Sequence, residues 1–282
     1  MPYIRAVSEP FARHGPAEPE SPVVLSVPHA GREYPAAMRG MARLAPPRLH
    51  VLEDRLVDAV ALAARERETT LVALRPRAWI DLNRGEDERD PLIDEGAPPA
   101  ATSHRLRSGL GLVPRRAGAA GDVWRRRLSD AEVRARIEED HRPYHRELAR
   151  LLAAARARFG MAVLLDIHSM PPLTSAGAPQ IVLGDRFGSA AAPGLVARLE
   201  QAVEEAGYRV ALNSPYAGGH VVATQASVAE RIHAVQVEID RRLYLDQRLD
   251  RLGTGLGETA RLLRRLIDVA ADEVLPRTLA AE

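Results

Sequence analysis

The sequence contains no cysteine and no lysine, and aromatic residues make up only 4% of its 282 residues. Without cysteine, disulfides, thiolate metal sites and cysteine nucleophiles are excluded, so any metal must be held by His, Asp or Glu. Without lysine, a Schiff-base lysine and a Walker-type phosphate lysine are excluded as well. All 39 basic residues are arginine, which genomic base composition explains, although an arginine beside catalytic residues also suits a carboxylate.

The chain also lacks an excess of either charge, with 39 basic and 38 acidic residues and a net charge of +1. A protein that binds nucleic acid needs a basic excess to neutralise phosphates, so this class is not expected. No apolar run approaches 18 residues, as a transmembrane helix requires, and the N-terminus has no apolar signal core. We therefore expect a cytoplasmic protein that has neither nucleic acid nor membrane as a partner, and the oligomeric state stays open.

Short apolar runs alternate along the chain with segments of helical periodicity, which is typical of an α/β fold. Residues 1–21 are polar and proline-rich and are predicted to form an irregular lead-in to a single α/β domain over 22–282. Strands are predicted at 22–27, 71–74 with 78–82, 161–167, 180–184, 208–212 and 234–239, and helices at 48–67, 129–158, 190–206 and 256–275. Because the strands are continuous apolar runs, we expect a mixed, mostly parallel sheet with helices on both faces. Residues 86–122 have weak periodicity and are interpreted as a functional loop or flap.

Two histidines follow buried strands, His29 after 22–27 and His168 after 161–167. In a parallel sheet, functional residues gather beyond the carboxyl ends of the strands. One histidine at such a position is as often a hydrogen-bonding cap of the strand, but two beside carboxylates favour metal binding. A catalytic zinc site has three protein ligands and one position left for water. The sequence thus predicts a site for Zn²⁺ or another divalent metal.

The third ligand is expected to be a carboxylate, and three are candidates. Glu33 lies four residues beyond His29, whereas Glu53 and Asp54 belong to the helix predicted after it. Helical spacing turns Glu53 towards the apolar face and Asp54 about a quarter-turn away. An acidic residue near a helix start also complements the helix dipole without binding a metal. These residues by themselves leave the choice open.

Glu238 is unusual because it stands between Val237 and Ile239 in a strand that should be buried. A buried carboxylate without a partner is costly. One explanation is an ion pair with Arg241 or Arg242 at the end of the strand. The other is a general base that activates a metal-bound water.

An Asn-Arg pair, Asn83 and Arg84, follows the predicted strand 78–82. An amide and a guanidinium together bind a carboxylate well, so the pair is a candidate substrate site, with a strand-end salt bridge as the alternative. Asp166 lies two residues before His168 and hence on the same face of its strand, where it can orient that ring.

Two further groups of polar residues are less specific. The loop 213–220 (NSPYAGGH) has two glycines that permit close approach to a ligand, and its Tyr216 and His220 are candidates for substrate binding, with a plain loop equally expected. His141, Tyr144 and His145 share one face of the helix predicted over 129–158. That face either borders the site or is solvated.

Eight segments match, in order, the motifs of a known family. They are LSVPHAGREYP (25–35), EDRLVDAV (53–60), IDLNR (80–84), GLGLVPR (109–115), PYHRELARLL (143–152), LLDIHSMPP (164–172), NSPYAGGH (213–220) and VQVEIDRRLYLD (235–246). Through them, and over about residues 20–250, the chain resembles the N-formylglutamate amidohydrolases. Each segment is a weak signal alone, whereas the ordered set is specific.

The resemblance implies a phosphorylase/hydrolase-like α/β fold of the zinc-dependent exopeptidase group. It further implies that His29, a carboxylate and His168 hold zinc. The zinc carboxypeptidases of that group use a His-x-x-Glu motif, whereas Arg32 stands three residues after His29 here. The carboxylate must come from elsewhere, and Asp54 is our choice.

By the same resemblance, Arg84 with Asn83 would bind the substrate's carboxylate and Glu238 would be the general base. The expected activity is metal-dependent hydrolysis of an N-formyl or N-acyl amino acid, foremost N-formyl-L-glutamate in histidine breakdown. One alternative is the same chemistry on another N-acyl amino acid or a small peptide. Another is a non-catalytic binder of small anionic metabolites, against which the intact His29, His168 and Glu238 argue.

Overall fold

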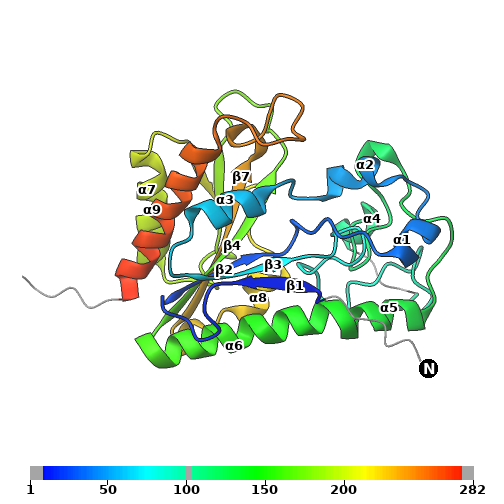
Figure 1. Ribbon diagram of the computed structural model, residues 1–282, viewed down its shortest axis with the longest axis horizontal. Helices are drawn as coiled ribbons and strands as arrows, with labels where there is room; N and C mark the ends of the chain where they lie inside the picture. The colour runs from blue at the N-terminus through cyan, green and yellow to red at the C-terminus, as the bar shows by residue number, and fades with distance from the viewer. Residues whose placement is uncertain (1–8, 100–102, 275–282) are drawn as a thin grey trace, which may run out of the picture.

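A seven-stranded sheet forms the centre of the computed structural model, which describes residues 9–99 and 103–274 (Figure 1). Its strand order is β1-β3-β2-β4-β7-β5-β6. The strands are β1 (Phe11–His14), β2 (Val23–Val27), β3 (Thr69–Ala73), β4 (Ala162–Met170), β5 (Ile181–Gly184), β6 (Val210–Leu212) and β7 (Ile232–Asp240). Only the pairs β1–β3 and β5–β7 are antiparallel. The predicted mixed, mostly parallel sheet is thereby confirmed.

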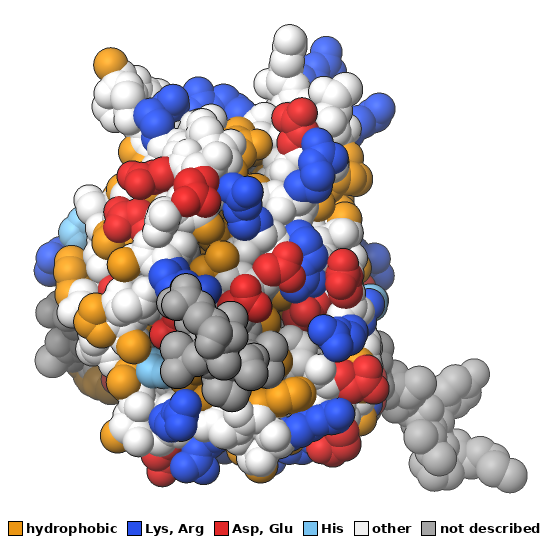
Figure 2. All heavy atoms as spheres, turned by 90° about the vertical axis from the view of Figure 1, so that its left-hand side faces the viewer, with side chains coloured by type: hydrophobic (Ala, Val, Ile, Leu, Met, Phe, Trp, Pro, Cys, Tyr) orange, Lys and Arg blue, Asp and Glu red, His pale blue; other side chains and the backbone are white. Residues whose placement is uncertain are grey.

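Helices cover both faces of this sheet, as predicted. On one face lie α3 (Val57–Ala64), α7 (Pro193–Glu205) and α9 (Leu256–Val274), and on the other α6 (Arg142–Phe159) and α8 (His220–Gln225). In Figure 1, α6 runs along the lower edge of the molecule, while α7 and α9 stand side by side at the left. Seen from that left-hand side in Figure 2, arginine and acidic side chains are interspersed, in keeping with the near-neutral net charge.

The remaining helices lie beyond the sheet, at the right of Figure 1. They are α1 (Ala36–Met41), α2 (Pro46–Leu49), α4 (His104–Arg107) and α5 (Asp130–Arg136). Among the described residues of the segment 86–122, predicted as a loop, the helical elements are α4 and a short 3₁₀ turn at Gly118–Ala120. Within the described part of the chain, no helix is long and apolar enough to cross a bilayer.

The apolar runs are continuous because the central strands β2, β4 and β7 are buried on both faces. In β2, Val23 and Leu25 face the cluster under α3 and α9, whereas Val24 faces the cluster under α6. Successive side chains of a strand point to opposite faces, so most residues of such a strand are apolar. This requirement is why the sequence located these central strands.

Two predictions about strands are wrong. Residues Phe11–His14, inside the predicted irregular lead-in, form β1 and pair with β3, about 60 residues further along the chain. Residues 78–82 are not a strand, although Ala78, Ile80 and Leu82 are buried. The backbone N–H of Asp81 donates to the carbonyl of Leu112, in the segment 86–122, instead of to a neighbouring strand. Asn83 and Arg84 therefore follow a buried turn and not a strand.

The helix predicted over 48–67 is broken in the middle. It consists of α2, a 3₁₀ turn at His50–Leu52 and α3, with extended backbone at Glu53 and a left-handed Leu56 between them. The break is held by tertiary hydrogen bonds, because the Asp54 N–H donates to the carbonyl of His29 and Arg241 donates to the carbonyl of Glu53. These bonds join segments that are distant in sequence, so the helical periodicity of residues 48–67 could not predict the break.

The helical segment predicted over 129–158 runs from α5 through a π-helical turn at Ile137–His141 into α6. Ser129 begins α5 with a capping box, since its hydroxyl accepts from the Glu132 N–H while the Glu132 carboxylate accepts from the Ser129 N–H. A π turn inserts a residue into an α-helix and is frequent at functional sites.

Candidate metal centre and active site

A hollow of about 430 Å³ lies at the carboxyl ends of β2, β4 and β7. Residues predicted for the site that line it are His29, Asp54, Asn83, Arg84, His168, Tyr216 and Glu238. They come from segments far apart in sequence and meet because parallel strands end at the same edge of a sheet. His220, predicted to bind substrate, does not line this hollow.

His29 follows β2 and is held by a buried carboxylate. Its Nε2 lies 2.7 Å from Asp81 Oδ1, and Arg77 donates to the other oxygen of Asp81 at 2.8 Å. Although burial opposes ionisation, the charges of Arg77 and His29 hold the pKa of Asp81 well below its usual range. A carboxylate only accepts, so His29 carries its proton on Nε2 and leaves the lone pair of Nδ1 directed elsewhere. Among the described residues, this buried Nδ1 has no hydrogen-bond partner.

His168 lies within β4, two residues before the strand ends, and repeats this arrangement. Its Nε2 is 2.9 Å from Asp166 Oδ2, so the predicted orienting role of Asp166 agrees with the geometry. Its Nδ1 faces Asp54 Oδ2 at 2.9 Å. Burial disfavours the charged ring, but the carboxylates of Asp166 and Asp54 raise the pKa of His168 well above its usual value. Without a cation between them, the ring must hold a second proton to satisfy both carboxylates.

Asp54 reaches the two rings through the break before α3. Its Oδ2 lies 3.5 Å from His29 Nδ1 and 2.9 Å from His168 Nδ1. Although burial acts in the opposite direction, the hydrogen bond with His168 and the nearby His29 ring hold the pKa of Asp54 well below its usual range. The other two candidate carboxylates bind elsewhere: Glu53 pairs with Arg55 at 2.9 Å and Glu33 pairs with Arg75 at 2.8 Å.

The group His29, Asp54 and His168 fits a divalent metal ion. One ligand atom of each lies within 4.8 Å of the others, and all three side chains are buried. Three lone-pair donors converge there, and one of them, His29 Nδ1, has no partner in the part of the chain that the structure describes. A buried acceptor without a partner is costly, and an ion would relieve that cost. Two imidazoles and one carboxylate are a donor set that zinc favours.

Glu238 stands in β7, opposite His168 in the register of the sheet. Its Oε1 accepts a hydrogen bond from Gln236 Nε2 at 2.8 Å. Burial is the main cause that raises its pKa to about 7, helped by the charge of Asp54 and opposed by that of His168. Among the described residues no arginine pairs with Glu238, because Arg241 binds Ser169 and the Glu53 carbonyl. The alternative of a strand-end ion pair is therefore wrong.

Asn83 is locked by its neighbours. Its Oδ1 accepts from the Val221 N–H at 2.9 Å, and its Nδ2 donates to Gln236 Oε1 at 3.1 Å. Arg84 uses Nε and Nη1 on the carbonyls of Leu110 and Asn83. The Nε atom also lies 3.8 Å from Asp81 Oδ2, so the alternative salt bridge is present as a long contact. Together these contacts fix the guanidinium at the wall of the hollow, and none of them uses Nη2.

Three further arginines line the same hollow, Arg77, Arg105 and Arg241. Arg241 binds Ser169 Oγ at 3.1 Å and lies 3.4 Å from Asp54 Oδ1, so it borders the metal group. Sequence reasoning considered Arg241 only as a partner for Glu238, and it missed Arg77 and Arg105 as lining residues. The composition could have pointed to them, because in a chain without lysine the permanently charged side chain that binds anionic ligands is arginine.

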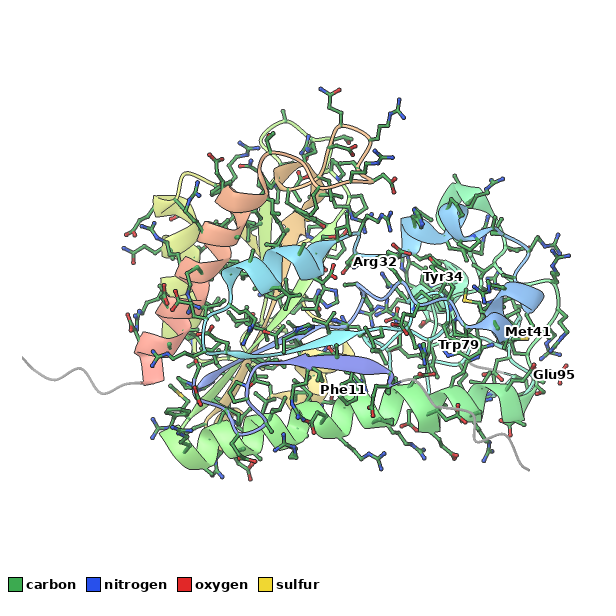
Figure 3. The ribbon with its side chains drawn as sticks, in the orientation of Figure 1. Phe11, Arg32, Tyr34, Met41, Trp79 and Glu95 are labelled. Carbon is green, nitrogen blue, oxygen red and sulfur yellow. The ribbon has the colours of Figure 1, made fainter. Side chains whose placement is uncertain are left out.

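Other hollows lie apart from this group. A larger one, about 820 Å³, is lined by Tyr34, Met41 and Trp79 among others and lies beyond the sheet, towards α1 and α5 (Figure 3). It shares no lining residue with the hollow at His29 and His168. Size alone therefore does not locate the chemistry. His220 lines a third hollow, of about 250 Å³, beside His141 and His145.

Comparison with known proteins places this geometry in context. The family model for N-formylglutamate amidohydrolase matches residues 21–245. The N-formylglutamate deformylase of Pseudomonas aeruginosa is 33% identical over 240 residues, which cover 80% of this chain and 83% of that protein. The crystal structure of N-formylglutamate amidohydrolase from Ralstonia eutropha superposes with a TM-score of 0.85 at 37% identity, covering 94% and 98% of the two chains. A protein of Agrobacterium tumefaciens, 20% identical, has a TM-score of 0.70 over 95% and 97%, and shares the fold.

Proposed function

The chain belongs to the N-formylglutamate amidohydrolase family, and we propose that it hydrolyses N-formyl-L-glutamate to L-glutamate and formate with a divalent metal ion, foremost zinc. The observation that carries this proposal is the buried group of His29, Asp54 and His168 beside Glu238, in a hollow lined by arginines. The relatives named for this activity support the choice of substrate. The resemblance of the sequence to this family implies the same reaction and places it in histidine breakdown.

The histidines and Asp54 would hold the ion, and Glu238 would move the proton. A bound ion of this kind polarises a carbonyl and lowers the pKa of a water. Glu238 Oε1 is held by Gln236, so Oε2 is the atom that takes the proton as water attacks the formyl carbon. The same carboxyl then returns the proton to the leaving nitrogen. Water thus supplies the hydroxyl of formate and the proton of the amine.

The arginines explain why the substrate is expected to be a dicarboxylate. N-formylglutamate has two carboxylates and one amide to be cleaved. Arg84 offers Nη2 to one carboxylate, and Arg105 also lines the hollow. Charge-assisted hydrogen bonds from guanidinium groups favour such a dianion over acyl amino acids with a neutral side chain.

Arg84→Met is expected to raise KM for N-formyl-L-glutamate by roughly 10–100-fold with a smaller change in kcat, since a hydrogen bond to a charged group contributes about 1.5–3 kcal/mol. Steady-state kinetics of formate release measure both constants. Arg248→Met, at an exposed position outside the hollow, is the matched control and should leave both constants unchanged. An unaltered KM in the Arg84 variant would remove this residue from the substrate site.

Formate release from a panel of N-acyl amino acids tests the function itself. The panel contains N-formyl-L-glutamate, N-formyl-L-leucine and N-acetyl-L-glutamate, with acetate measured for the last. We expect the highest kcat/KM for N-formyl-L-glutamate, because only this compound offers both carboxylates and the small acyl group. Preference for the acetyl compound would shift the substrate to another N-acyl amino acid. Binding of the dicarboxylate without hydrolysis, in protein that contains no stoichiometric metal, would favour a non-catalytic binder.

A further inference from the structure

Three histidines that the proposed reaction does not use lie together on the far side of the Asn83-Arg84 segment. One ring nitrogen each of His141, His145 and His220 lies within 4.8 Å of those of the other two. The ring centroids of His141 and His145 are 4.4 Å apart, and those of His145 and His220 are 5.1 Å apart. The three line a hollow of about 250 Å³ that is open to solvent on the side of Thr224.

Two structural features bring these rings together. His141 ends the π-helical turn and His145 stands one helical turn later in α6, so the two share a face. His220 begins α8 directly after Gly219, where a Cβ atom would lie only 2.3 Å from the Asn83 side chain. Glycine is thus required there for His220 to approach α6 so closely.

Hydrogen bonds fix the tautomers of the two helix residues. His141 Nε2 lies 2.8 Å from the carbonyl of Arg84, and His145 Nε2 lies 2.9 Å from the carbonyl of Leu82. A carbonyl only accepts, so both rings donate from Nε2 and keep a lone pair on Nδ1. His141 is only 2% exposed, and its Nδ1 has no hydrogen-bond partner among the described residues. His145 Nδ1 has a long contact, 3.4 Å, with the Gln225 amide.

The charge of the cluster is consistent with a cation. The ring nitrogens that keep a lone pair are the atoms with which an imidazole binds a metal. The carboxylate of Glu86 lies 3.9 Å from His141 Nδ1 and is held by Arg142. His141 and His145 share one feature with His29 and His168, which is an outer hydrogen bond on Nε2 that orients the ring.

We propose that His141, His145 and His220 form a second metal site, which takes a divalent transition-metal ion such as Zn²⁺. Three imidazoles favour zinc, nickel or copper over magnesium or calcium, which prefer oxygen ligands. A tetrahedral zinc ion places its nitrogen ligands about 3.4 Å apart. The nitrogens lie within 4.8 Å of one another, so a bound ion would require them to move closer, and the half-buried side chains of His145 and His220 have more room to do so than the buried His141.

A metal ion at this site would stabilise the backbone that carries Asn83 and Arg84, and thereby the substrate pocket. The ring of His141 binds the Arg84 carbonyl and that of His145 binds the Leu82 carbonyl. An ion that fixes these rings therefore fixes the backbone that carries Asn83 and Arg84. Its role is structural, since the cluster shares no lining residue with the hollow around Glu238.

Metal counting separates the two sites. Chelator-treated full-length protein is loaded with Zn²⁺, passed through a desalting column and analysed for bound metal. We expect two ions per chain in the wild type and one in His29→Ala/Asp54→Ala. None should remain when His220→Phe is added to that double variant. His104→Gln, which removes an exposed histidine of α4, is the matched control and should retain two.

Cobalt(II) provides a second readout, because its visible absorption reports nitrogen ligation without any need for activity. The spectrum of His29→Ala/Asp54→Ala should show one bound ion, and His145→Gln in that background should abolish it. If the double variant binds no ion while the wild type binds one, the second site is refuted and the proposed catalytic site stands. If a single wild-type ion persists in the double variant, the cluster is the metal site and the proposed catalytic site fails.

Discussion

Glu238→Gln is expected to lower kcat for N-formyl-L-glutamate by roughly 10²–10⁴-fold, the usual contribution of a general base or acid. The amide keeps the shape of the carboxyl group but cannot take a proton from water. Gln236 still binds the remaining oxygen, so the side chain should keep its place beside His168. Formate release under substrate saturation measures the effect.

The metal content and KM of this variant distinguish catalysis from structure. Both should stay near the wild-type values, because Glu238 lies outside the group of three ligand atoms. Glu258→Gln, an exposed change in the first turn of α9, serves as the matched control and should keep full activity. A Glu238→Gln enzyme with wild-type kcat would refute the assignment of the base.

The pH profile gives the same assignment an independent check. Burial raises the pKa of Glu238 to about 7, and only the deprotonated carboxylate acts as a base. Activity should therefore fall as the pH drops through this pKa. A bound cation favours the ionised carboxylate, so the acidic limb of kcat/KM should lie at about 7 or below. In Glu238→Gln this limb should disappear from the residual activity.

Asp54→Ala is expected to abolish metal binding by His29 and His168 and to reduce activity by more than about 100-fold. A residue that only orients a metal ligand contributes roughly 10–100-fold to metal affinity or activity, so the loss of a ligand itself should cost more. The loss leaves two facing imidazoles without their shared carboxylate. Metal analysis and formate release on the same preparation measure both effects. In the wild type, a chelator should remove activity and added Zn²⁺ should restore it.

Glu33→Gln is the comparison that tests the choice of ligand. Glu33 was an equal candidate in the sequence, but it is half exposed and paired with Arg75. We expect this variant to keep its metal. Loss of metal from Glu33→Gln and its retention in Asp54→Ala would reverse the assignment.

Much of the fold was predictable because burial on both faces of a sheet leaves a continuous apolar run. The runs around Leu25, Leu164 and Val235 located β2, β4 and β7, and with them the sheet edge where His29, His168 and Glu238 meet. β1 was missed because four partly buried residues at a sheet edge carry little apolar pattern. The run at 78–82 was misread because a buried turn is as apolar as a buried strand.

The third ligand could not be chosen from local pattern. Helical periodicity extended one helix through Asp54, whereas the backbone there is bound by His29 and Arg241. Those bonds cross about 25 and about 190 residues of sequence, and only folding brings the partners together. Arg77 and Arg105 were missed as lining residues for the same reason, since their positions depend on a long irregular segment that packs by tertiary contacts.

The composition itself determined the kind of site that this protein can have. In a chain without cysteine or lysine, imidazole and carboxylate are the side chains that suit zinc, and arginine is the one permanently charged side chain for an anionic ligand. The order of its motifs determined the family. Tertiary structure alone decided which carboxylate faces the two histidines, which nitrogen of each ring is free, and that His220 joins a separate cluster. The physical reason is that these choices are made by hydrogen bonds between segments that lie far apart in sequence, whereas composition and periodicity report only local preference and burial.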